Sequence, residues 1–556
     1  MKLVKMRQDA AEPERVSLVE QDGSAKTSRL LNPARMLSSW RGRIWPLLLI
    51  VLLLIALIPY LRVTVATSRH GLSPSTGVPL ALFPIVGASA IALFSLLRPV
   101  WALAAFFAIT PVVNGLVARV TIGNPVLYKK AGLLGVELLF LSLALGLLLR
   151  RVIRPDPGGA RRVENGVAFY ALAVLASMTL FYLQDPWWWD RLILAWRHIP
   201  SGRQLSPNHP FRAGLLILAS LLCYRLTLNQ LKTSKAIQLV CRGWLVGAFL
   251  TGIYGVSVWT PWKWSQLYAQ TALLLEDVNS YGSYLVLTLF IAWGELLAER
   301  KPWARVLSGL TLLLTVWMIP LAGSRIAIIA ATAGAGIAWT ILAGSIRGCW
   351  IRASVLAAFV AGILLFTFVG GYALVEKTFD RRGVFYTGMH KVVQAMDARL
   401  VLNIWQGDRQ GLMAAGIRMV EESPALGLGP GTAYRELGRG RYYGPEDKGY
   451  VLDRYENLHN YFLQVAAETG LLGLAGFLWV VLAVVARGFF RDLGKERRLA
   501  RLFSIGVGSY LITAFTSHPL ILSKQAFLFW GGLGVLAACS QRGHASSSGR
   551  QCSSQE

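Results

Sequence analysis

The sequence predicts an all-α protein, a polytopic transmembrane helical bundle, and three observations support this fold class. Of its 556 residues, 54% are hydrophobic and only 15% are charged. The mean hydropathy is +0.49. Apolar runs of about 20 residues recur between Trp45 and Ala538, and a helix of that length crosses the roughly 30 Å of hydrocarbon in a bilayer. This composition is that of a membrane protein with many spans.

The apolar runs define the expected spans one by one. In chain order, the candidates are 44–62, 77–97, 100–119, 129–151, 165–183, 213–230, 237–258, 278–298, 302–320, 324–345, 352–374, 460–486, 503–518 and 520–539. Two pairs, 77–97 with 100–119 and 503–518 with 520–539, contain short runs that can also be re-entrant. The sequence therefore predicts about 12–14 spans.

The orientation follows from the short connections that are rich in arginine and lysine. "RRVIRPDPGGARR" (150–162), "ERKPWAR" (299–305) and "RGFFRDLGKERRLAR" (487–501) fall on one side of the alternating topology. The positive-inside rule makes this side cytoplasmic, together with both termini. A formal net charge of +27 is also typical of nucleic-acid binding. Here topology explains most of the excess, so no nucleic-acid partner is expected.

The predicted organisation separates membrane-spanning parts from polar ones. The parts are a cytoplasmic, disordered tail (1–43), a transmembrane bundle (44–374) with an outer loop at 184–212, a large outer loop (375–458), C-terminal transmembrane helices (459–540) and a cytoplasmic tail (541–556). The polar start lacks a short apolar core followed by a small-residue cleavage site, so no removable signal peptide is expected. The large outer loop far exceeds the usual connection length, which favours a functional segment.

Two motifs stand out within the large outer loop. The stretch "QGDRQGLMAAGIRMVEESPALG" predicts a helix that Asp408 can cap and Pro424 stops. The stretch "GLGPGTAY" (427–434) predicts a turn. A glycine-rich loop can also bind phosphate through its backbone N–H groups, although this one lacks the preceding strand and the lysine of a P-loop. Both interpretations of the glycine-rich stretch stay open at this point.

The topology places three polar residues at the same outer surface. Arg325 opens the span 324–345, Arg409 lies in the large outer loop, and His459 precedes the span that follows this loop. An arginine at the end of a span is also typical of an interfacial anchor, and Arg409 could be a solvated helix charge. His459 and Asn460 could simply satisfy the free backbone groups at a helix start.

These residues belong to a longer pattern. The segments "SRIAIIAATAG", "DRQGLMAAGIRMVEESPALGLGPGTA" and "LHNYFLQVAAETGLLGLAGF" resemble the shared module of the O-antigen ligase and O-antigen polymerase superfamily. The similarity covers roughly residues 315–485. A looser match, "EDVNSYGSYLVL" (276–287), contains Asn279. The other spans agree with this superfamily only in number and hydrophobicity.

The resemblance implies a GT-C-type membrane glycosyltransferase in the bacterial inner membrane. The implied donor is O-antigen polysaccharide on undecaprenyl pyrophosphate, used at the periplasmic face. In the ligase branch, the implied acceptor is a sugar hydroxyl of lipid A–core, and the product is complete lipopolysaccharide. This branch implies no metal, no nucleotide sugar and no other cofactor.

Physical chemistry suggests roles for the three outer residues in such a reaction. Breaking the bond between a sugar and pyrophosphate leaves negative charge on the departing group, which preorganised cations stabilise in a water-poor site. Arg325 and Arg409 are therefore the expected pyrophosphate-binding residues, because arginine is always protonated and can grip phosphate with two donors. His459 is the expected general base toward the acceptor hydroxyl, or alternatively a hydrogen-bond donor to phosphate.

Other polar residues have weaker indications of a role. Glu456 could orient the His459 ring, although a solvated loop carboxylate is the commoner situation. Arg191 follows the tryptophans at 187–189, which are typical interface anchors but could also contact sugar. Basic residues elsewhere in that loop, including Arg212, extend the same surface.

Two acidic residues inside predicted spans need partners. Glu137 and Glu468 are expected to pair with other helices, and Lys524 is one candidate partner. On an ideal helix Glu468 would face away from His459, so its influence on the chemistry is expected to be indirect.

Several functions share these features. Within the superfamily, the large single loop before His-Asn favours a ligase over a polymerase or a protein-glycosylating relative. A transporter would have similar hydropathy, but substrate sites in transporters tend to lie near mid-bilayer between repeated halves, whereas the notable polar residues here gather at one surface. An assembly protein that uses the outer loop for docking remains a third possibility.

Overall fold

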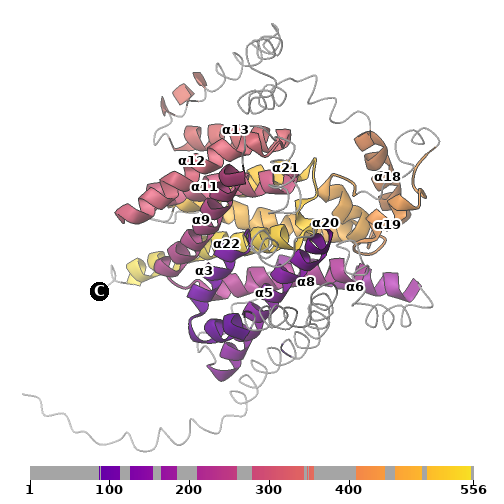
Figure 1. Ribbon diagram of the computed structural model, residues 1–556, viewed down its shortest axis with the longest axis horizontal. Helices are drawn as coiled ribbons and strands as arrows, with labels where there is room; N and C mark the ends of the chain where they lie inside the picture. The colour runs from indigo at the N-terminus through magenta and orange to yellow at the C-terminus, as the bar shows by residue number, and fades with distance from the viewer. Residues whose placement is uncertain are drawn as a thin grey trace, which may run out of the picture.

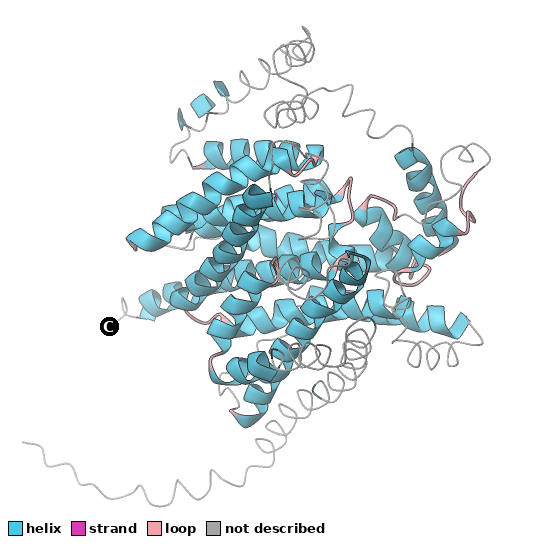
Figure 2. Ribbon diagram, in the orientation of Figure 1, coloured by secondary structure: helices cyan, strands magenta, loops and turns pink. Residues whose placement is uncertain are grey.

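The computed structural model describes residues 89–112, 125–154, 165–184, 210–258, 278–342, 408–444, 457–490 and 497–552, together with a few isolated positions. The described part is helical and contains no strand; Figure 2 shows helices joined by short loops. Backbone N–H and C=O groups have no water to bind inside a bilayer, so an apolar chain satisfies them within its own helices. The all-α prediction is confirmed.

The named elements follow the apolar runs of the sequence. In chain order (Figure 1) they are α3 (Pro99–Ile109), α5 (Pro125–Ile153), α6 (Asn165–Gln184), α8 (Pro210–Gln230), α9 (Ser234–Val258), α11 (Val278–Ala298), α12 (Pro302–Leu321), α13 (Arg325–Ile341), α18 (Asp408–Glu422), α19 (Thr432–Gly438), α20 (Tyr461–Phe490), α21 (Arg497–Ala514), the short 3₁₀ helix η4 (Pro519–Ile521) and α22 (Ser523–Cys552).

Six of the described helices are long and apolar enough to cross a membrane: α6, α8, α9, α11, α12 and α20. The protein is thus a multi-pass helical membrane protein. α11 has the bounds that the sequence predicts, 278–298. α21 is shifted toward the N-terminus relative to the predicted span 503–518, because it begins at Arg497 and ends at Ala514. α22 also continues past residue 540 into the segment predicted to be a tail. The predicted spans 44–62 and 352–374 lie almost wholly outside the described residues.

Two helices organise the bundle. α11 packs against α21, α12 and α13, and α20 packs against α6 and α21. α22 lies against α8 and extends toward the C-terminal end of the chain, at the left in Figure 1. The two loop helices α18 and α19 lie at the opposite end, at the right in the same view. We call this the cap end of the bundle.

The described part of the large loop, residues 408–444, forms a cap with its own small core. The predicted loop helix is present as α18, and the glycine-rich turn leads into α19, a short helix that the sequence did not indicate. Buried apolar side chains hold the cap on the start of α20: Leu412, Ala415, Met419, Ala433, Leu437, Tyr442, Leu458 and Ala467. The cap is therefore fixed to the bundle by hydrophobic burial.

The helix α20 is interrupted at Gly470, whose φ and ψ are 71° and 179°. The loop after α18 supplies the hydrogen bonds that the interrupted helix lacks. Leu471 N donates to Pro424 O (2.8 Å), and Gly429 N donates to Glu468 O (2.9 Å). A helix break at membrane depth requires such replacement partners, because lipid offers none. The cap and the broken helix thus form one hydrogen-bonded unit.

Replacing Gly470 with alanine should destabilise this unit strongly. Only glycine adopts this backbone conformation readily, and a residue with a side chain in the same conformation destabilises the folded protein by about 1–3 kcal/mol. An added Cβ would also lie 2.0 Å from Ala425 O. We expect a lower thermal unfolding temperature in detergent and faster proteolysis between residues 408 and 444. Gly508→Ala is the matched control, because a Cβ there meets no atom within 4 Å; equal stability of both variants would contradict this account.

A buried ion pair links three helices of the bundle. Arg212 of α8 donates to Glu137 Oε1 of α5 through Nη2 (2.5 Å) and Nε (3.2 Å), and Ser523 of α22 also donates to this oxygen. Burial of one such charge without the other is costly. Glu137 thus pairs with other helices, as predicted. The prediction that Arg212 lies on a loop surface is wrong, because its side chain is buried. Lys524, the other candidate partner of the buried acidic residues, is fully buried.

Candidate functional site

Four helix ends meet at the cap end, close to the connection 515–518. Tyr461 N, at the start of α20, donates to Ser517 O (3.1 Å). Gln525 Nε2 of α22 donates to Ser280 O at the start of α11 (2.6 Å). The hydroxyls of Ser283 in α11 and Thr513 in α21 lie 2.7 Å apart. These bonds place the starts of α11, α20 and α22 beside the end of α21.

His459 lies at this junction in an unusual backbone conformation. Its φ is 50°, and it is the one non-glycine residue with positive φ in the described part of the chain. Such conformations cost free energy and tend to occur at functional sites. The next residue, Asn460, accepts a hydrogen bond from Leu463 N (3.1 Å) through its side chain. Asn460 therefore performs the helix-capping role that was the structural alternative for His459.

A second histidine, which the sequence analysis did not identify, contacts the first. The rings of His459 and His518 are 4.8 Å apart between centroids, with an angle of 64° between their planes. His518 follows Ser517, the residue that binds the start of α20. The sequence assigned His518 to the end of a span, whereas it lies in the connection between α21 and η4. The only sequence feature that could have indicated a role for His518 is its place between two apolar segments on the predicted outer side.

The cap carries Arg409 to the same place. Arg409 is the second residue of α18, a helix held to the start of α20 by the cap core. Burial lowers the pKa of His518 from 6.5 to about 3, and the neighbouring His459 and Arg409 contribute to this shift by disfavouring a positive charge. Arg409 thus lies close enough for its charge to act on His518, and the structure brings Arg409, His459 and His518 together.

We expect the stability of the folded protein to fall as the pH drops from 7 to 5, partly because of His518. Below its ordinary pKa of about 6.5 the unfolded chain protonates this ring, whereas the folded protein keeps it neutral down to about pH 3. The unfolded state then binds more protons, which costs the folded state at most about 1.4 kcal/mol per pH unit. Thermal unfolding at pH 5, 6 and 7 tests this: His518→Phe should show the flatter dependence, and equal slopes would contradict it.

Arg325 and Asn279 lie at the same end of the bundle, on neighbouring helices. Arg325 is the first residue of α13, and Asn279 is the second residue of α11. The two helix starts pack closely, since a Cβ on Gly282 would lie 2.9 Å from Ser324 Cβ and 2.8 Å from Ala327 Cβ. Arg325 is partly exposed. The described contacts therefore place the start of α13, which carries Arg325, beside the start of α11, and the start of α11 belongs to the junction.

Two predicted site residues, Arg191 and Glu456, lie outside the described residues. Their suggested contacts with sugar and with the His459 ring remain predictions.

The glycine-rich stretch points its backbone amides toward a protein carboxyl group. The N–H groups of Gly431 and Ala433, at the start of α19, donate to the Glu468 side chain. This arrangement occupies the donors that the phosphate alternative required, so it favours a structural turn. The ideal-helix geometry assumed for Glu468 and His459 does not apply, because His459 is not helical and α20 starts only at Tyr461; the indirect influence of Glu468 on the chemistry stays a prediction.

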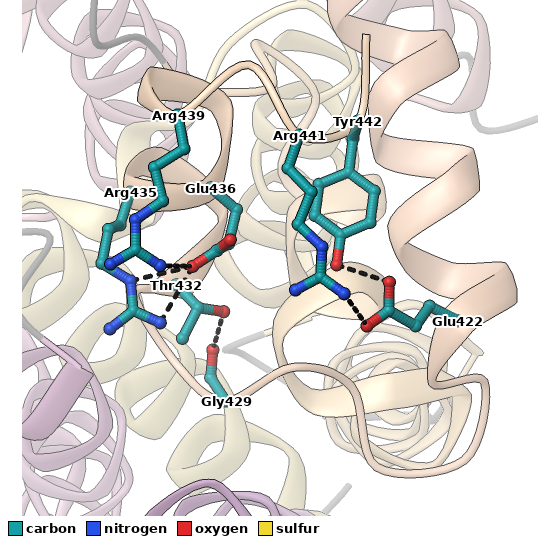
Figure 3. Close-up of polar contacts among 8 residues, drawn as sticks. All are labelled: Glu422, Gly429, Thr432, Arg435, Glu436, Arg439, Arg441 and Tyr442. Carbon is teal, nitrogen blue, oxygen red and sulfur yellow. Dashed lines mark hydrogen bonds and ion pairs between the residues drawn. The ribbon is translucent and has the colours of Figure 1, made fainter. Parts of the chain in front are cut away.

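Other arginines of the cap form ion pairs with nearby glutamates (Figure 3). Arg435 and Arg439 both contact Glu436, at 2.9 Å and 3.0 Å, and Arg441 contacts Glu422 at 2.9 Å. The Arg435 guanidinium also lies 5.4 Å from the centroid of the Phe181 ring. Arg439 and Arg441 are largely exposed. The Arg441–Glu422 pair is exposed on both sides and contributes little to stability, and the buried Glu436 keeps Arg435 as a partner when Arg439 is replaced. These residues therefore serve as controls for substitutions nearer the junction.

Comparison with known proteins identifies the segment that carries Arg325, Arg409 and His459. Residues 310–478 match the family model described as O-antigen ligase. The match includes α13 with Arg325, the cap with Arg409, and the start of α20 with His459. No curated protein matches the chain significantly.

Proposed function

We infer that this membrane protein, whose residues 310–478 match the O-antigen ligase family, transfers O-antigen polysaccharide from undecaprenyl pyrophosphate to a sugar hydroxyl of lipid A–core. The observation that carries this proposal is the contact of His459 with His518 beside the charge of Arg409; His459 and Arg409 lie inside the matched segment, and His518 lies beyond its end. A cation and a histidine so placed suit a phosphorylated sugar whose lipid tail remains in the bilayer.

The reaction would replace one bond of the anomeric carbon by another. The acceptor hydroxyl oxygen attacks this carbon, while the bond from the carbon to the pyrophosphate oxygen breaks and its electron pair stays on the pyrophosphate. Arg409 and Arg325 would bind the departing phosphate oxygens, because fixed cations at a water-poor site stabilise charge that develops in the transition state.

His459 would remove the proton from the attacking hydroxyl. A histidine is well suited to this role because it loses and gains a proton near neutral pH. The neighbouring His518 stays neutral over this range, since burial and the nearby positive charge lower its pKa to about 3. His518 would therefore support the His459 ring without competing for the proton.

The location of the site fits substrates that are partly lipid and partly glycan. The start of α20, which belongs to the junction, packs against the cap through Leu458 and Ala467. A site there would let the lipid carrier lie in the membrane while both glycans extend on the periplasmic side. Asn279, at the start of α11, would lie along the path of the donor.

Transfer between purified components tests the proposal. The purified protein in detergent or vesicles receives lipid-linked O-antigen and lipid A–core, without ATP or added metal, and the product is followed by gel mobility and mass spectrometry. Formation of full lipopolysaccharide would support a ligase. Extension of one lipid-linked glycan by another would instead indicate a polymerase, and the absence of both products would overturn the proposal.

A strain that lacks the chain provides a second test. Loss of the O-antigen ladder with accumulation of lipid-linked polymer is the expected result. Lipid A–core that carries a single repeat would indicate a polymerase. Accumulation of the lipid-linked glycan on the cytoplasmic side would indicate a transporter.

A further inference from the structure

A buried chain of hydrogen bonds connects the inside of α20 to the segment that carries His459. Gln464 Nε2 donates to Asn457 Oδ1 at 3.1 Å and to Glu468 Oε1 at 3.0 Å. Gln464 and Glu468 are only 2% and 5% exposed. Gln464 therefore uses both hydrogens of its amide nitrogen between two acceptors.

The inner end of this chain is fixed by the cap. The Glu468 side chain accepts from Gln464 and from the backbone N–H groups of Gly431 and Ala433. The same residue's backbone oxygen accepts from Gly429 N at 2.9 Å and from Ser177 Oγ at 2.8 Å. Glu468 is thus held by the cap, by α6 and by its own helix.

The outer end of the chain lies two residues before His459. Asn457 is tied to Gln464, and the next residue, Leu458, is fully buried in the cap core. On the other side, Asn460 caps α20. His459 is the single residue between these two anchors, and it takes up the change in chain direction with a φ of 50°. The anchors therefore determine where its ring lies.

We propose that Asn457, Gln464 and Glu468 are positioning residues that hold the His459 ring against His518 and beside Arg409. The proposal rests on the role of His459 as the base that the proposed function assigns to it. The three residues contribute no proton and no contact with the glycan. They act by keeping the strained His459 backbone in one conformation, so that the ring nitrogen meets the acceptor hydroxyl.

The experiment swaps the amide and the carboxylate that form the hydrogen bond between Gln464 and Glu468, first one at a time and then together. Gln464→Glu places two carboxyl groups together, and Glu468→Gln places two amide groups together. The double variant restores one donor and one acceptor, with the Asn457 amide rotated so that its nitrogen donates to the carboxylate introduced at position 464. Glu422→Gln is the matched control, because Glu422 is an exposed residue of the same cap. Thermal unfolding shows whether each variant folds.

We expect each single variant to lower kcat for glycan transfer by about 10²-fold, the cost of a misplacement of roughly 1 Å. The KM for the lipid-linked donor should change little, since the arginines remain in place. The double variant should recover most of the kcat, and Glu422→Gln should behave as wild type. The proposal would be overturned if the single variants had wild-type kcat. It would also be overturned if the double variant had wild-type stability but a kcat as low as that of the single variants.

A second measurement does not depend on glycan transfer. Diethyl pyrocarbonate modifies accessible histidine, and peptide mass spectrometry measures its rate at His459 alone. The rate should rise several-fold in both single variants and return toward wild type in the double variant. Unchanged rates in the single variants would overturn the inference even in an active enzyme. If the wild type transfers no glycan but the rates change as expected, the proposed function fails while the positioning of His459 stands.

Discussion

Arg409→Ala is expected to reduce kcat for glycan transfer by about 10²–10³-fold, the usual loss when one preorganised donor to a developing negative charge is removed. The cap core that holds α18 in place consists of apolar side chains of other residues, so we expect the variant to fold and insert normally. Arg409→Lys should recover only part of the rate, because an ammonium group keeps the charge but loses the two-pronged contact with phosphate. Initial rates with purified donor and acceptor measure both variants.

The control for this experiment is Arg439→Ala. Arg439 belongs to the same cap and is largely exposed, and its described ion pair is with Glu436. Glu436 is buried, but it keeps its ion pair with Arg435 when Arg439 is removed, so the rate should stay near that of wild type. If Arg409→Ala also transferred glycan at the wild-type rate, the assignment of Arg409 to the pyrophosphate would be wrong. The same comparison applies to Arg325→Ala, for which we expect a similar loss.

His459→Gln is expected to lower kcat by about 10²–10⁴-fold, the range associated with loss of a general base. Glutamine keeps a polar side chain of similar reach, but it cannot accept a proton at neutral pH. The wild-type rate should rise with pH as the histidine loses its proton, and this rise should be absent in the variant. Rate measurements between about pH 5 and 9 with the purified protein test both statements, because this range brackets the ordinary histidine pKa.

The pH dependence separates the two roles considered for His459. A hydrogen-bond donor to phosphate can act through the one N–H of the neutral ring as well as in the protonated form, so the wild-type rate would not need to rise with pH. His518 does not complicate this comparison, because it remains neutral throughout the range. A glutamine variant with nearly wild-type rate and an unchanged pH profile would exclude the base role.

The sequence by itself determined the class of fold and much of the helix placement. The length of an apolar run indicates a span, because a helix forms the hydrogen bonds of its backbone within itself. α6 and α11 have almost the predicted bounds. The motif around the arginines and His459 pointed to the ligase family, which the match to residues 310–478 confirms. The helix in the outer loop was likewise predicted from its cap and its stop signals, and is present as α18.

Only the tertiary structure decided which polar groups meet. His518 reaches His459 because the connection 515–518 binds the start of α20, and nothing local to either histidine encodes this contact. Glu468 faces the amides of Gly431 and Ala433 because α20 breaks at Gly470 and the cap fills the break. Periodicity along one helix specifies its apolar character, but the partner of a polar side chain depends on how several helices and the cap pack together.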